Sequence, residues 1–141
     1  MKRLLIAGVG VCLLGGGLIA GSAPGQSTVY APKDCTTPKV EPKRILLACG
    51  DAGIELKQMR WNRWNTAKAK GKGKVTIQIC DPSCAEGPVK NYKVNVTLLN
   101  IKNATCGGQT LPMYRRAHLR YPDKKPPNTN TLRSFQLACN S

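Results

Sequence analysis

Residues 66–79 alternate between two kinds of side chain along their whole length. One parity carries lysines and the other carries small and apolar residues: Lys68, Lys70, Lys72 and Lys74 against Ala67, Ala69, Gly71, Gly73, Val75, Ile77 and Ile79. A period of two is the period of a β-strand, whose successive side chains point to opposite faces of a sheet. We therefore expect one long strand with ammonium groups about 6.5–7 Å apart on one face.

Further segments have the composition or the alternation of strands, and turn residues separate them. They are residues 44–49, 56–64, 91–101, 113–121 and 133–139. No 3.6-residue period is sustained, so the chain is predicted to be all-β, a small disulfide-stapled sandwich or barrel of about six strands. The parity slips between Leu56 and Met59, which predicts a bulge or a single helical turn.

The first 22 residues have the organisation of a signal peptide. Lys2 and Arg3 precede an uncharged apolar run that ends at Ala20, and the small residues that follow favour cleavage after Ser22. The protein is therefore expected to be secreted or associated with the cell envelope. The alternative is an uncleaved N-terminal anchor, because about 17 apolar residues reach the lower end of the membrane-spanning range.

Export also accounts for the odd number of cysteines. Cys12 leaves with the signal peptide, and the remaining six are Cys35, Cys49, Cys80, Cys84, Cys106 and Cys139. An even number in an exported chain predicts three disulfides but leaves their connectivity open. We favour a bridge from Cys49 into the loop that holds Cys80 and Cys84, since it would tie a strand end to a turn. A zinc site is not expected, because thiols are oxidised outside the cell.

The chain after the signal peptide divides into a Pro-rich tether, residues 23–43, and a single β domain, residues 44–141. The whole chain has 22 Lys and Arg against 7 Asp and Glu, and loss of residues 1–22 leaves a net charge of +13. So basic a balance favours a polyanionic partner, such as anionic cell-wall polymer, acidic lipid, nucleic acid or acidic protein. The alternative is that the charge serves solubility alone.

Residues 44–99 contain the motifs LAC-x-D, L, W-x-x-W, A-x-A-x-G and C-x-P-x-C-A-x-G in this order. Their residues are Leu47, Ala48, Cys49, Asp51, Leu56, Trp61, Trp64, Ala67, Ala69, Gly71, Cys80, Pro82, Cys84, Ala85 and Gly87. With this pattern the segment resembles a group of small exported proteins of high-GC Gram-positive bacteria. The resemblance implies export and a β fold and assigns no functional residue. Its members carry Thr or Ser where Lys68, Lys70 and Lys72 stand in this chain.

The lysine row is the candidate binding site. Lysines at this spacing match the phosphate repeat of a linear polyanion, and Arg116 and Arg120 on a second strand would widen the basic track. The alternative is an edge or half-exposed strand whose lysines prevent edge-to-edge aggregation. Trp61 and Trp64 point to opposite faces of a regular strand, so core or boundary packing is expected for them.

No arrangement of residues predicts catalysis. His118 is the single histidine, and no motif places a second acid or base beside it. Metal-ligand and cofactor-binding patterns are missing from the sequence, so we expect a non-enzymatic protein without a cofactor. Two other hypotheses stay open: a structural or protein-interaction module, and a small secreted nuclease that uses His118.

Overall fold

The computed structural model describes residues 27–50 and 53–139, and the predicted signal peptide lies outside them. Eight strands are found there: β1 (Ala31–Pro32), β2 (Pro38–Lys39), β3 (Ile45–Leu46), β4 (Ile54–Trp64), β5 (Ala69–Gln78), β6 (Val89–Cys106), β7 (Gln109–Arg120) and β8 (Ser134–Gln136). No helix long and apolar enough to span a membrane occurs in this part of the chain.

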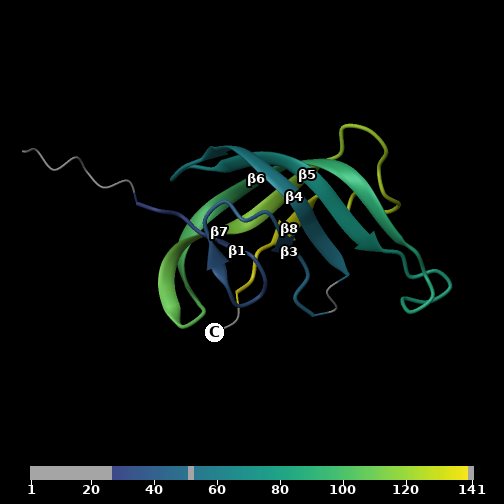
Figure 1. Ribbon diagram of the computed structural model, residues 1–141, viewed down its shortest axis with the longest axis horizontal. Coiled ribbons are helices and arrows are strands. Elements are labelled where there is room, and N and C mark those ends of the chain that lie inside the picture. Colours follow the sequence, from purple (N-terminus) through teal and green to yellow (C-terminus); the bar gives the residue numbers. More distant parts are fainter. Residues whose placement is uncertain (1–26, 51–52, 140–141) are drawn as a thin grey trace, which may run out of the picture.

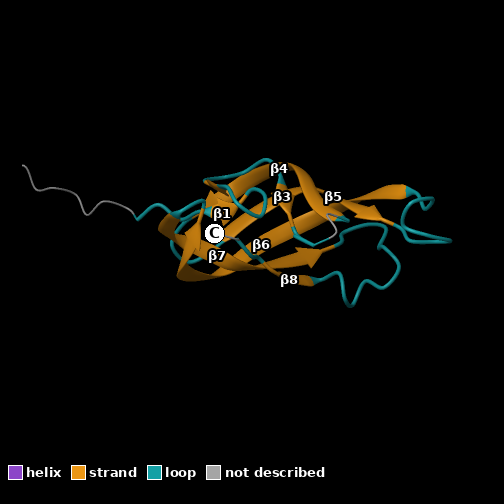
Figure 2. Ribbon diagram, turned by 90° about the horizontal axis from the view of Figure 1, so that it is seen from below, coloured by secondary structure: helices purple, strands orange, loops and turns teal. Residues whose placement is uncertain are grey.

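Six of the strands form one antiparallel sheet in the order β3-β4-β5-β6-β7-β8, so each strand pairs with its neighbours in sequence. The strands β1 and β2 form a separate small sheet. Figures 1 and 2 show the large sheet curling on itself into a half-barrel. The predicted all-β fold with three disulfides is confirmed. Throughout, the inner face of this sheet is the side that carries the core, and the outer face is the opposite side.

The lysine-bearing strand, β5, lies in the middle of the large sheet. It pairs with β4 on one side and with β6 on the other. Ala69, Val75 and Ile77 are buried in the core, while the lysines within the strand are exposed, as the alternation predicts. Because both edges of β5 are paired, the interpretation of its lysines as protection for an exposed edge is wrong.

The neighbouring strand β4 contains two irregularities. Its register against β5 shifts between Lys57 and Arg60, and again between Trp61 and Arg63. The first shift confirms the bulge predicted from the slipped parity, and Gln58 within it has a φ of 52°. Each bulge adds one residue to β4 relative to β5, which changes the face to which the following side chains point.

The bulges turn both tryptophans of β4 to the inner face. Trp61 lies opposite Gly71, and Trp64 lies opposite Ala69. The two indole rings meet edge to face, with their centroids 4.9 Å apart. Both residues are half-buried and pack against the core, so the packing predicted for them is confirmed.

From Val29 onward, the segment before β3, where the sequence predicts a tether, packs onto the core. Val29 and Ala31 are buried among the core residues. The indole Nε1 of Trp64 donates to the carbonyl oxygen of Val29 at 2.8 Å, and that of Trp61 donates to the carbonyl oxygen of Pro42 at 2.9 Å. Two tryptophans therefore fasten this segment, and the folded unit includes residues well before position 44.

The three predicted disulfides are present, with a different connectivity from the one we favoured. The pairs are Cys35–Cys49, Cys80–Cys84 and Cys106–Cys139. The strand β3 runs beside the N-terminal segment, where the Leu46 amide donates to the carbonyl oxygen of Lys33 at 3.1 Å. Cys49 follows β3 and therefore meets Cys35, whereas Cys80 and Cys84 close their own loop after β5. The expected bridge from Cys49 into that loop is wrong.

Candidate functional site

Cationic side chains of β4 and β5 lie next to each other on the outer face. Each lysine of β5 has a cation as its cross-strand neighbour on β4: Lys70 pairs with Arg63, Lys72 with Arg60 and Lys74 with Lys57. Paired strands lie about 4.8 Å apart, so these charges are closely spaced. The two bulges of β4 are necessary for this arrangement, because they bring Arg60 and Arg63 to the same face.

Two rows of outward-facing residues continue from β5 across β6 to β7. The Lys72 row consists of Arg60, Lys72, Asn95 and Arg120, and the Lys70 row consists of Arg63, Lys70, Thr97 and His118. In both rows β6 supplies a neutral polar residue between the basic residues of its neighbours. In these two rows the basic character extends across the strands and is interrupted at β6, whereas Lys93 of β6 lies opposite Lys74.

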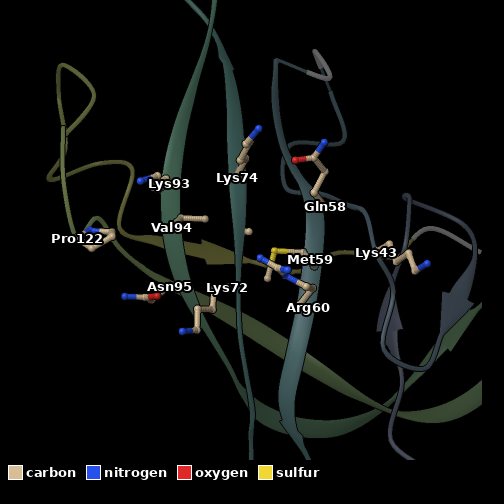
Figure 3. A pocket seen from close by; sticks show the side chains of 11 residues that line it. Lys43, Gln58, Met59, Arg60, Lys72, Lys74, Lys93, Val94, Asn95 and Pro122 are labelled. Atoms are coloured by element: carbon tan, nitrogen blue, oxygen red, sulfur yellow. The ribbon is translucent and has the colours of Figure 1, made fainter.

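Two hollows lie on either side of the Lys72 row. The first has a volume of about 650 Å³ and is lined by Arg60 and Lys72 on one side and by Lys74 and Lys93 on the other. Figure 3 shows these side chains coming from β4, β5 and β6 around it. The second hollow, of about 480 Å³, lies between the Lys72 and Lys70 rows, and Arg133 contributes to its lining.

Most cations of this face have no acidic partner. Within residues 27–50 and 53–139, Lys57 and Lys93 form ion pairs, with Glu55 at 3.0 Å and with Asp123 at 3.2 Å, and Glu55 also pairs with Arg44. The cations without an ion pair there are Arg60, Arg63, Lys70, Lys72, Lys74, Arg116, Arg120 and Arg133. Their charges are uncompensated by the protein, so the face has a positive potential that attracts anions.

The structure brings together four of the six residues predicted from the sequence. Lys70, Lys72, Lys74 and Arg120 line the hollows. Lys68 precedes β5, is only partly exposed and lines neither hollow. Arg116 is exposed on β7, opposite Leu99 of β6, and it also lies outside the linings of the two hollows. These two residues therefore belong to the margin of the surface.

Sequence reasoning missed three arginines of the outer face, of which Arg60 and Arg133 line the hollows and Arg63 does not. Arg60 and Arg63 are three positions apart, so strict alternation would send them to opposite faces. The slipped parity at Met59 was the signal that could have found Arg60. Arg133 lies just before β8 and reaches the second hollow only because the chain folds back beside β7, where its carbonyl oxygen accepts from the Leu119 amide at 2.8 Å.

No family model, curated protein or solved structure matches this chain. The resemblance to exported proteins stays a prediction, and function must be inferred from the residues themselves. In the part of the chain that the structure describes, no three His, Cys, Asp or Glu side chains are grouped to hold a metal ion. The outer face, with its two hollows, is the best-defined candidate site.

Proposed function

We propose that this domain binds a linear anionic polymer of the cell envelope through its outer face and has no catalytic role. The observation that carries the proposal is the group of cations without acidic partners around two hollows in the middle of the sheet. Three disulfides are typical of proteins in oxidising compartments, which supports export. An envelope polymer would be the first polyanion that such a protein meets.

The number of contacts sets how strongly binding depends on salt. A cation that neutralises a phosphate of a single-stranded polymer contributes about −0.7 to the slope of log K against log salt concentration. Contacts from Arg60, Arg63, Lys70, Lys72 and Arg120 together predict a slope of about −3.5. A tenfold rise in salt concentration would then lower the binding constant by about 3,000-fold.

The test compares two triple variants that remove the same charge from different surfaces. Lys70, Lys72 and Lys74 are changed to Gln in one. In the matched control, Lys33→Gln, Lys39→Gln and Lys102→Gln replace three exposed lysines that line neither hollow. Binding of the disulfide-bonded protein to poly(glycerol phosphate) is measured by fluorescence anisotropy over a series of salt concentrations.

We expect the outer-face variant to lose about 1.4 units of slope, because it removes two of the five contacts, those of Lys70 and Lys72, at about 0.7 each. The control is expected to keep nearly the full slope. Equal losses in both variants would mean that net charge alone drives binding and would refute the site. A binding constant that changes neither with salt concentration nor with either set of substitutions would instead favour a protein-interaction module.

A further inference from the structure

The outer face carries two groups of cations, and in the Lys72 and Lys70 rows the residues of β6 between them, Asn95 and Thr97, are neutral. The first bank, from β4 and β5, consists of Arg60, Arg63, Lys70 and Lys72. The second bank consists of Arg120 at the end of β7 and Arg133 just before β8. The strand β6 separates the banks. Because β5 and β7 are two strand spacings apart, the banks lie about 10 Å from each other.

The second hollow spans this whole distance. Its lining begins with Asn62 on β4 and continues over β5, β6 and β7 to Arg133. A polymer that followed β5 would meet the first bank and would leave the second bank unused. A polymer that crosses the strands reaches both banks within one hollow. The shape of the surface therefore favours a crossing path.

The residues between the banks have the chemistry of hydroxyl recognition. Asn95 and Thr97 are partly exposed and line the second hollow. Within the described residues, no hydrogen bond involves either side chain. An amide and a hydroxyl can each donate and accept, as a ligand hydroxyl can, whereas a phosphate diester only accepts. A hydroxyl-bearing segment thus fits β6 better than a further anionic group does.

Aromatic side chains are missing from the linings of both hollows, apart from the imidazole of His118. Proteins that hold single-stranded nucleic acid stack its bases on aromatic rings. In this protein the rings of Trp61 and Trp64 lie on the inner face and their Nε1 groups bond to the N-terminal segment. The outer face therefore offers phosphate contacts without a platform for bases.

We infer that the ligand is a polyol-phosphate or sugar-phosphate polymer that crosses the strands. Its phosphates contact the first and second banks, and the hydroxyl groups of the segment between them bond to Asn95 and Thr97. The inference rests on the proposed polyanion-binding function and adds the path of the polymer and its chemical class. Inorganic polyphosphate and single-stranded DNA share the charge of this ligand but lack the hydroxylated segment.

The first experiment tests the path. Arg120→Gln with Arg133→Gln removes the second bank, and Lys33→Gln with Lys39→Gln is the control of equal charge. At about 0.1 M salt the loss of two phosphate contacts is expected to weaken binding of poly(glycerol phosphate) by about 25-fold. The control should stay within about twofold, since its lysines line neither hollow.

The second experiment tests the chemical class. Asn95→Ala with Thr97→Val removes the hydrogen-bonding groups and leaves every charge in place. We expect this variant to bind poly(glycerol phosphate) about 30-fold more weakly, because the two lost hydrogen bonds contribute about 1 kcal/mol each. Inorganic polyphosphate with the same number of charges should bind it as it binds the native protein. Thermal unfolding of each variant checks that the fold is retained.

The outcomes separate the two levels of the proposal. If substitution of Lys70, Lys72 and Lys74 weakens binding but substitution of the second bank does not, the polymer follows β5. The crossing path is then overturned, while polyanion binding stands. If the variant at Asn95 and Thr97 weakens polyphosphate equally, or oligo(dT) competes as well as poly(glycerol phosphate), the hydroxylated class is overturned. If no polyanion binds, the proposed function itself fails.

Discussion

The inner side of β5 leads to a sharp prediction about stability, the substitution Gly71→Ala. A Cβ atom on Gly71 would lie 2.7 Å from the carbonyl oxygen of Arg60 and 2.7 Å from Cε3 of Trp61. Neither neighbour has room to retreat. The carbonyl belongs to the paired strand β4, and the indole is held by its bond to Pro42 and by the ring of Trp64. Overpacking of this kind destabilises a core by about 1–3 kcal/mol.

Urea unfolding followed by tryptophan fluorescence, with the disulfides intact, measures the effect. A loss of about 2 kcal/mol at an m-value of about 1.5 kcal/mol/M lowers the unfolding midpoint by about 1.3 M. Gly50→Ala is the matched control, because nothing lies within 4 Å of the position that its Cβ would take. Its midpoint should stay the same or rise slightly. If both variants unfold within about 0.2 M of the native protein, the close approach of Trp61 to Gly71 does not constrain the fold.

Three further predictions concern titration, cross-linking and surface charge. Burial, with a smaller effect of Tyr92, raises the pKa of Tyr121 to about 12, so the folded protein holds this proton more tightly than the unfolded chain. The protonated side chain therefore stabilises the folded state below pH 10, the usual pKa of tyrosine, and this stabilisation is lost as the pH rises towards 12. In Tyr121→Phe, the free energy of unfolding measured in urea should fall less steeply over this pH range. An equally steep fall would contradict the prediction. Changing Cys35 and Cys49 to Ser removes a disulfide between residues 14 positions apart and should destabilise the protein by about 3 kcal/mol. A loss of stability below about 1 kcal/mol would show that the N-terminal segment is held without this disulfide. Lys72→Gln removes repulsion on the outer face and should raise the melting temperature at low salt but not at about 0.5 M, where charges are screened; destabilisation at low salt would mean that the lysine stabilises the fold.

Local patterns in the sequence were sufficient to predict the six strands of the large sheet, but not β1 and β2 before them. The alternation around Lys72 defined β5 and its two faces, because the strand period follows from backbone geometry alone. The slipped parity at Met59 located the first bulge of β4. The even number of cysteines after the predicted signal peptide indicated three bridges, since unpaired thiols are rare in exported proteins.

Features that depend on contacts between distant segments could not be predicted. The partner of Cys49 depends on which segment runs beside β3, and the packing of Val29 depends on the direction of the Trp64 indole. Only the three-dimensional structure shows either. The candidate site has the same limitation. Arg63 joins the outer face through a second bulge, and Arg133 reaches it by the return of the chain beside β7.

The residues on the two faces of β5 are constrained differently. On its inner face, position 71 must be small, because the indole of Trp61 lies against Gly71. Its outer row is not constrained in this way, since β6 satisfies the same sheet geometry with neutral Asn95 and Thr97. Lysines opposite cations on β4 destabilise the sheet, because like charges directly opposite repel. A bound polyanion would remove this repulsion. Ligand binding would then stabilise the fold as well as occupy the site, and most strongly at low salt.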